Sequence, residues 1–188
     1  DKIKSALDGG VRALQLREKP KSDRDLLAVA QRLRLLTREY GALLFINERA
    51  DVAQLCGADG VHLGQSGIPL LRARKLLGDE AIIGVSAHNL TEAQKAEDAR
   101  ADFITFGPVY QTPSKTQYGA PLGIGSLKET TGRVNIPVYA IGGVNKDRIK
   151  EVLMAGASGV AVISAILAGV DVRKNAEELL MELDRVRR

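Results

Sequence analysis

The sequence predicts an α/β fold, a single (β/α)8 barrel domain over residues 1–188, and three observations favour it. Short apolar segments alternate with amphipathic segments along the whole chain, which is the pattern of strands and helices in turn. Most of the apolar segments are continuously apolar, as expected for parallel strands that are covered on both sides. A short phrase rich in Gly and Ala also recurs before the apolar segments, which indicates a repeated helix–strand unit.

Seven of the apolar segments are predicted strands. Each is rich in β-branched, aromatic or other apolar residues and is followed closely by glycine or a polar residue. The predicted strands are Ala13–Leu16, Leu43–Ile46, Gly60–Leu63, Ile82–Ser86, Phe103–Phe106, Val138–Ile141 and Gly159–Ile163.

We expect eight helices, six of which can be bounded. The longest places Leu26, Ala30 and Leu33 on one face and most of its arginines on the other. Residue types suited to helix N-termini stand near several of the starts: Ser22 or Asp23, Pro69, Asn89 and Asn145. The bounded helices are Asp1–Asp8, Asp23–Tyr40, Ile68–Leu77, Leu90–Ala99, Asn145–Ala155 and Val172–Arg187.

The recurring phrase has the forms Asp8-Gly-Gly-Val, Cys56-Gly-Ala-Asp-Gly-Val, Ala101-Asp-Phe and Ala155-Gly-Ala-Ser-Gly-Val. Its glycines suit the left-handed end of a helix, and its small residues allow a helix and a strand to pack closely. Such repeats build either a closed barrel or an open doubly wound sheet. No Gly-x-Gly-x-x-Gly follows the first predicted strand, which argues against a dinucleotide-binding sheet. Because the chain opens within a predicted helix, we expect the first strand of the barrel upstream of residue 1.

Composition narrows the classes of function. Hydrophobic residues make up 45% of the chain and charged residues 27%, which excludes general disorder, and the apolar runs are too short to span a membrane. A net charge of +4 favours anionic ligands, whereas 4% aromatic residues and no Trp argue against a nucleic-acid partner. With Cys56 as the single cysteine, we expect no internal disulfide, no structural zinc and a cytoplasmic location.

Polar or glycine-rich segments follow every predicted strand. In a barrel of this kind the ends of the strands converge on one rim, where the chemistry takes place. The segments are Gln15-Leu-Arg-Glu-Lys19, Asn47-Glu-Arg49, His62-Leu-Gly-Gln65, Ser86-Ala-His88, Gly107-Pro-Val-Tyr-Gln-Thr-Pro-Ser-Lys115, Gly142-Gly143 and Ile163-Ser164.

These segments favour phosphate ligands. Gln15, Arg17 and Lys19 alternate, so an extended backbone points all three the same way. Arginine forks onto two phosphate oxygens and lysine adds a point charge. The turns at Gly142-Gly143 and Ile163-Ser164 match the phosphate cradle of backbone N–H groups that barrels carry after their last two strands. We therefore expect one anion site made of side chains and a second made of backbone.

The order and spacing of seven motifs resemble one family over residues 8–167, the thiamine phosphate synthases and the related thiazole tautomerases. The motifs are Gln15-Leu-Arg-Glu-Lys, Asn47-Glu-Arg-Ala-Asp-Val-Ala, Gly60-Val-His-Leu-Gly-Gln, Ile83-Gly-Val-Ser-Ala-His, Phe106-Gly-Pro-Val-Tyr-Gln-Thr-Pro-Ser-Lys, Ala140-Ile-Gly-Gly-Val and Gly159-Val-Ala-Val-Ile-Ser-Ala-Ile. The resemblance implies a (β/α)8 barrel fold. It also implies a transferase activity that joins a pyrimidine diphosphate to a thiazole phosphate and releases pyrophosphate. It also implies Mg²⁺ on the diphosphate.

The resemblance assigns site residues to both substrates. Those implied to hold the pyrimidine diphosphate are Gln15, Arg17, Lys19, Asn47, Ser86 and Lys115. Those implied to hold the thiazole phosphate are Thr112 and Ser114, with the backbone of Gly143, Ile163 and Ser164. Catalysis is expected from Arg17, Lys19, Ser86 and Lys115, which stabilise the leaving diphosphate, and it needs no side-chain nucleophile.

Two positions depart from the family pattern, and they leave alternatives to the synthase function open. Glu48 stands where the family usually has an Asp metal ligand, and Gly67 stands where it usually has a second. We therefore expect Glu48 to be the only protein carboxylate on Mg²⁺. One alternative is a thiazole tautomerase with His88 as its acid/base, and another is a non-catalytic paralogue that binds a thiamine precursor or a protein. The expected partners are small phosphorylated substrates, and a homo-oligomer is compatible with the sequence.

Overall fold

A computed structural model describes residues 1–18, 22–112 and 120–188 of the chain. Its centre is a seven-stranded sheet in which the strands lie side by side in chain order. All six neighbouring pairs are parallel. The strands are β1 (Ala13–Leu16), β2 (Leu43–Asn47), β3 (Gly60–Leu63), β4 (Ile82–Ala87), β5 (Phe103–Phe106), β6 (Val138–Ile141) and β7 (Gly159–Ala161). The seven predicted strands are confirmed, each to within two residues at its ends.

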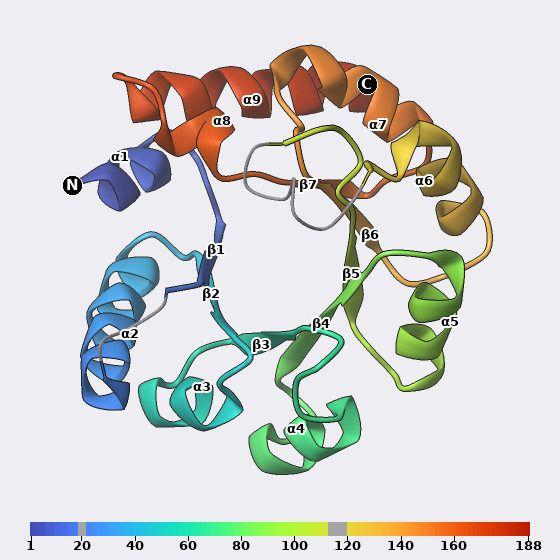
Figure 1. Ribbon diagram of the computed structural model, residues 1–188. Helices are drawn as coiled ribbons and strands as arrows, with labels where there is room; N and C mark the ends of the chain where they lie inside the picture. Colours follow the sequence, from blue (N-terminus) through green and yellow to red (C-terminus); the bar gives the residue numbers. More distant parts are fainter. Residues whose placement is uncertain (19–21, 113–119) are drawn as a thin grey trace.

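The sheet is curled, with helices around its outer face (Figure 1). The helices are α1 (Lys2–Asp8), α2 (Asp23–Glu39), α3 (Ala50–Cys56), α4 (Leu70–Leu77), α5 (Leu90–Asp98), α6 (Gly123–Thr131), the 3₁₀ turn η2 (Lys146–Arg148), α7 (Ile149–Met154), α8 (Ser164–Leu167) and α9 (Val172–Arg187). In the part of the chain that the structure describes, β1 and β7 are the edges of the sheet and do not pair with each other. The prediction of an α/β fold with a parallel sheet is confirmed, whereas these residues form a curled sheet and not a closed eight-stranded barrel.

Two of the predicted helix caps form as expected. Ser22 accepts the backbone N–H of Asp25 at the start of α2, and Asn89 accepts that of Glu92 at the start of α5. Asn145 precedes η2 without a side-chain cap bond. The segment predicted as one helix from Asn145 therefore begins as a 3₁₀ turn before α7. No helix among residues 1–18, 22–112 and 120–188 is both long and apolar enough to cross a membrane.

Aromatic side chains fill the inner face of the curled sheet. Phe103 lies 5.5 Å from Phe45 and 5.5 Å from Tyr139 between ring centroids, both edge to face, and stacks on His62 at 5.9 Å. Gly84 makes room for it, because a Cβ there would lie 2.2 Å from the Phe103 ring. His62 is buried, and its Nε2 lies 3.1 Å from the Thr105 hydroxyl, an arrangement that suits a structural histidine. The interior is thus packed, and ligands must bind at the ends of the strands.

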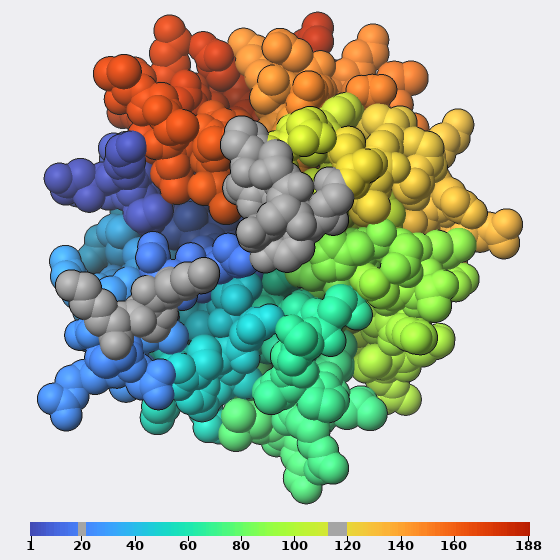
Figure 2. Space-filling model, viewed as in Figure 1, coloured from blue at the N-terminus to red at the C-terminus, as the bar shows by residue number. Residues whose placement is uncertain are grey.

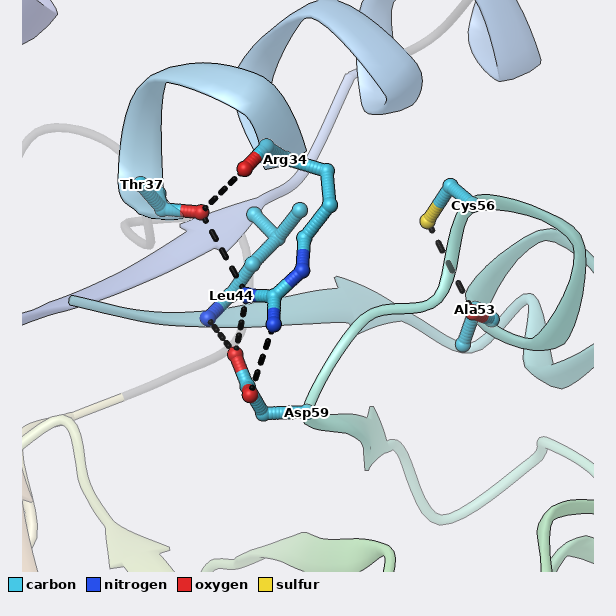
Figure 3. Close-up of polar contacts among 6 residues, drawn as sticks. All are labelled: Arg34, Thr37, Leu44, Ala53, Cys56 and Asp59. Atoms are coloured by element: carbon cyan, nitrogen blue, oxygen red, sulfur yellow. Dashed lines mark hydrogen bonds and ion pairs between the residues drawn. The ribbon is translucent and has the colours of Figure 1, made fainter. Parts of the chain in front are cut away.

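The opposite, N-terminal ends of the strands are held by a clamp of charged groups (Figure 3). Asp59, just before β3, accepts the backbone N–H of Leu44 in β2 at 2.7 Å and both terminal nitrogens of Arg34 from α2, at 2.7 and 3.1 Å. Asp102, just before β5, repeats the device with the N–H of Ile83 at 2.6 Å and Arg74 of α4 at 2.7 Å. The aspartates of the recurring phrase therefore tie each of two helices to the sheet.

Candidate active site

The carboxyl ends of the seven parallel strands meet at one rim, where the loops of the predicted site lie. Figure 2 shows that segments from the N-terminal through the C-terminal part of the chain surround this face. Three of the predicted site residues, Lys19, Ser114 and Lys115, lie outside the described residues. The others lie at the rim and divide into two regions, one after β1 to β4 and one after β5 to β7.

The first region begins with two amides and a cation. The Gln15 side-chain N–H of β1 donates to Oδ1 of Asn47, the last residue of β2, at 3.0 Å. Arg17 follows β1 directly and is exposed. No hydrogen bond or ion pair to another described residue engages the Arg17 side chain, so its positive charge is available to a ligand. Two amides and an uncompensated guanidinium suit an anionic ligand with several oxygens.

Glu48 sits beside them with an unusual backbone. Its φ is 61°, in the left-handed region that few residues with side chains adopt, and its N–H donates to the His62 carbonyl at 2.9 Å. This conformation carries the carboxylate across to the loop after β3. A Cβ on Gly64 would lie 2.4 Å from Oε1 of Glu48, and a Cβ on Gly67 would lie 3.8 Å from it. Gly67 is therefore at the right place for a second carboxylate beside Glu48 and does not supply one.

Arg49 ties the loops after β1 and β2 together, a role that the sequence pattern does not signal. Its guanidinium bonds Asp51 at 2.9 and 2.7 Å and Asp23, the first residue of α2, at 2.6 Å. The hydrogen bonds from Arg49 hold the pKa of Asp51 below its usual value. The start of α2 and the Glu48 loop therefore keep a defined relative position.

The end of β4 supplies Ser86 and His88. The Gln65 side-chain amide donates to the Ser86 carbonyl, which joins the loop after β3 to this strand. Nδ1 of His88 lies 3.0 Å from Oε2 of Glu92, and the same oxygen accepts the His88 backbone N–H at 2.8 Å. At the start of α5, the Glu92 backbone N–H donates to the Asn89 side-chain oxygen at 2.8 Å, and the Asn89 side-chain amide donates to Oε1 of Glu92 at 2.8 Å. The helix cap thus sets the orientation of the His88 ring.

In the second region the loop after β5 packs on the turn after β6. Val109 donates its N–H to the Ile141 carbonyl at 2.9 Å, and Tyr110 donates to Gly142 at 3.0 Å. Gly142 and Gly143 have φ of 94° and 66°. A Cβ on either would lie under 3 Å from the loop after β5. Both the conformation and the space therefore require glycine in this turn.

The remaining predicted residues lie close by. Thr112 is half-buried at the end of the described part of the β5 loop. Ile163 is exposed and Ser164 begins α8, directly after β7. Since Ile141 of β6 pairs with Ala161 of β7, the turn at Gly142-Gly143 and the start of α8 leave the rim as neighbours. The rim therefore places side chains suited to anions on one side and a glycine turn beside a helix start on the other.

One side chain can be set apart from this chemistry. Cys56 is buried at the end of α3, and burial raises the pKa of its thiol. Its Sγ lies 3.6 Å from the Ala53 carbonyl (Figure 3). A protonated thiol in this environment is a packing group and not a nucleophile.

Comparisons with known proteins agree on one family. The family model described as thiamine monophosphate synthase matches residues 1–166. A relative from Geobacter sulfurreducens is 53% identical over 178 residues, 95% of this chain and 84% of its own length. The thiamine-phosphate synthase of Clostridium novyi is 44% identical over 94% of this chain and 87% of its own. The solved thiamine phosphate pyrophosphorylase from Pyrococcus furiosus superposes with a TM-score of 0.91 at 41% identity, over 98% of this chain and 89% of its own.

Proposed function

The chain belongs to the thiamine monophosphate synthase family, and we propose that its rim joins 4-amino-2-methyl-5-(diphosphomethyl)pyrimidine to a thiazole phosphate, giving thiamine phosphate and pyrophosphate. The observation that carries this proposal is the pair of regions on one rim. An exposed arginine beside two amides suits a diphosphate, and a glycine turn beside a helix start suits a second phosphate. Placing two phosphorylated substrates next to each other is what a transferase of this kind requires.

For the diphosphate, Arg17 would fork onto two of its oxygens, and Gln15 and Asn47 would donate from their amides. Ser86 would add a hydroxyl donor from β4. Breaking the bond between carbon and diphosphate leaves negative charge on the leaving group. Donors held in place before the reaction stabilise that charge most when it develops, in the transition state. Lys19 and Lys115, which lie outside the described residues, are proposed to act in the same way.

For the thiazole phosphate, the backbone of Gly143, Ile163 and Ser164 and the hydroxyls of Thr112 and Ser114 are the proposed partners. Held there, the thiazole nitrogen needs to travel only a short way to the carbon that loses the diphosphate. The new C–N bond replaces the broken C–O bond, and the electron pair of the old bond leaves with pyrophosphate. This displacement requires no nucleophilic side chain.

The direct test is to incubate the purified chain with both phosphorylated precursors and Mg²⁺ and to follow thiamine phosphate by chromatography with fluorescence detection after oxidation to thiochrome. We expect one pyrophosphate for each thiamine phosphate. A protein that binds either precursor and forms no product would support the non-catalytic alternative instead.

Mg²⁺ is the proposed cofactor, and Glu48 is the residue that would hold it. Among the described residues no three His, Cys, Asp or Glu side chains gather into a metal site, and Gly67 beside Glu48 has no side chain to offer, so Glu48 is the one protein carboxylate that we propose for the ion. When bound, the ion supplies charge neutralisation to the diphosphate. Magnesium keeps several water ligands readily, so one carboxylate together with diphosphate oxygens is a sufficient set. We therefore expect the diphosphate to be needed for tight metal binding.

Gly67→Asp is expected to strengthen metal binding. A Cβ at this position would lie 3.8 Å from Oε1 of Glu48, and Gly67 is not at positive φ, so an Asp side chain fits beside the Glu48 carboxylate. The added charge should lower the Mg²⁺ concentration for half-maximal coupling by roughly tenfold. Calorimetric titration of Mg²⁺ into the enzyme with a non-reacting diphosphate gives a second measurement. Gly67→Asn is the neutral control, and a Gly67→Asp enzyme that needs as much metal as this control would refute the assignment.

A substitution of His88 distinguishes the coupling reaction from the tautomerase alternative. The observation that favours the tautomerase is the His88 ring at the rim, which Glu92 holds in place. In the coupling reaction His88 transfers no proton, so His88→Asn should keep the rate within about tenfold of the parent. In a tautomerase the same change should cost roughly two to four orders of magnitude in proton exchange on the thiazole carboxylate, as loss of a general acid–base does. The measurement is the two rates side by side. Loss of coupling as large as that would contradict the proposed mechanism.

Closure of the barrel is also part of the proposal. An eighth parallel strand between β7 and β1 would complete the predicted (β/α)8 barrel. Both strands offer an unpaired edge within the described sheet, and α1 packs against α8 and α9 so that the outer helices already meet (Figure 1). A cytoplasmic location agrees with Cys56 as the single, free cysteine.

A further inference from the structure

Three side chains behind the rim connect the loop after β5 to the turn after β6, and none of them belongs to the predicted site. They are Tyr110 in that loop, Arg148 at the end of η2 and Glu151 in α7. We propose that Arg148 is a positioning residue for the second substrate: it fixes the glycine turn and the Thr112 loop in one relative position. The inference rests on the proposed function, because it takes this region to hold the thiazole phosphate.

Arg148 contacts both segments at once. Its Nη1 donates to the Gly143 carbonyl at 2.5 Å, and its guanidinium carbon lies 4.3 Å from the centre of the Tyr110 ring. The Tyr110 hydroxyl in turn donates to Oε2 of Glu151 at 2.6 Å, which holds the ring from its far end. Burial and this hydrogen bond both raise the pKa of Tyr110, so the hydroxyl stays protonated as a donor. A planar guanidinium can donate in its plane and stack on a ring with its face, which an ammonium group cannot do.

The glycine turn needs such a restraint. Gly142 and Gly143 are consecutive glycines at positive φ, and glycine has more backbone conformations open to it than any other residue. In a planar trans peptide the C=O and the N–H point in opposite directions. The Tyr110 N–H binds the Gly142 carbonyl and thereby sets the direction of the Gly143 N–H. Arg148 binds the Gly143 carbonyl and sets that of the Val144 N–H in the same way. The two contacts together aim the amides of the turn.

The positive charge of Arg148 is its second effect on the turn. Arg148 forms no ion pair with another described residue, and the nearby Glu151 is engaged by Tyr110 through its Oε2. The guanidinium contributes positive potential behind the turn, which the carboxylate of Glu151 partly offsets because the Tyr110 hydroxyl bound to it is neutral. Both effects act on whatever anion the turn binds and leave the first region, across the rim, unaffected.

The test is a comparison of Michaelis constants for the two substrates. Arg148→Ala is expected to raise KM for the thiazole phosphate by about tenfold, the usual effect of losing one hydrogen bond of this kind, with KM for the pyrimidine diphosphate unchanged. Arg148→Lys keeps the charge and loses the stacking, so it should recover only part of the effect. Lys150→Ala removes an exposed cation of α7, two positions along the chain, and as the matched control it should behave as the parent.

Tyr110→Leu provides a second route to the same result. It removes the ring under Arg148 and should again raise KM for the thiazole phosphate alone, even if Arg148→Ala fails to fold. Equal increases in both constants, or no increase in either, would overturn the inference. If the parent itself forms no thiamine phosphate, it is the proposed function that fails. Binding of inorganic phosphate to the parent and to Arg148→Lys, followed by calorimetry, then tests the positioning role separately.

Discussion

Replacing Arg17 with alanine is expected to lower kcat of the coupling reaction by roughly two orders of magnitude, the usual cost of removing one preorganised donor from a site where charge develops. Arg17 is exposed at the end of β1, and it has no ion-pair or hydrogen-bond partner among the described residues. No described residue competes for its guanidinium, so the substitution removes a contact with the ligand and none within the protein. The measurement is steady-state kinetics with the thiazole phosphate saturating.

Two further variants give the Arg17 result its meaning. Arg17→Lys keeps a positive charge and loses the two-pronged geometry, so its kcat should fall between those of the parent and Arg17→Ala. Arg24→Ala removes an exposed arginine from the first turn of α2, a short distance along the chain, and should change kcat by less than about twofold. Unchanged kinetics in Arg17→Ala would mean that the loop after β1 is not where the diphosphate binds.

Local pattern was sufficient to predict the strands. Buried parallel strands are nearly continuous in apolar residues, so segments such as Ile82–Ser86 are evident without any knowledge of their neighbours. The helices α3 and α6 were harder to bound. The segment of α6 begins Gly123-Ile-Gly and carries no clear apolar stripe, because only Leu127 and Thr130 are buried in it. Where the buried face of a helix is narrow, the spacing of its apolar residues carries little information about its ends.

The supporting contacts of the site could not be predicted from pattern at all. Arg148 and Tyr110 are far apart in the sequence and meet only because β5 and β6 are neighbours. Arg49 and Asp23 meet only because β1 pairs with β2. The sequence predicts Glu48 as a carboxylate at the rim, but its left-handed backbone follows from the loop that carries it. Chemistry at the ends of strands is visible in a sequence, whereas the contacts that orient it depend on the tertiary fold.

The largest effect on stability is expected from the clamp at the other end of the strands. Asp59→Asn should lower the free energy of unfolding by roughly 2–3 kcal/mol, because removing one partner of a mostly buried ion pair leaves the other charge without compensation. The Arg34 and Asp59 side chains are only 15% and 23% exposed. Arg34 already has a buried Nε without a hydrogen-bond partner among the described residues, so the charge of Asp59 is its main compensation. Asparagine would also offer a weaker acceptor to the Leu44 N–H.

Urea denaturation followed by circular dichroism measures this loss of stability. Substitutions of two other aspartates of the chain serve as controls. Asp102→Asn breaks the second copy of the clamp, but Asp102 is 43% exposed, so water compensates more of the lost charge and the loss of stability should be smaller. Asp184→Asn removes a carboxylate of α9 that has no hydrogen-bond partner among the described residues, and it should leave the midpoint unchanged. Replacing Arg34 by Met in the Asp59→Asn variant should restore part of the lost stability, since no unpaired charge then remains and the asparagine can still accept the Leu44 N–H. A midpoint for Asp59→Asn equal to that of Asp184→Asn would show that the clamp contributes nothing to folding. The order Asp59, Asp102, Asp184 is the one expected if burial of the charge determines the loss.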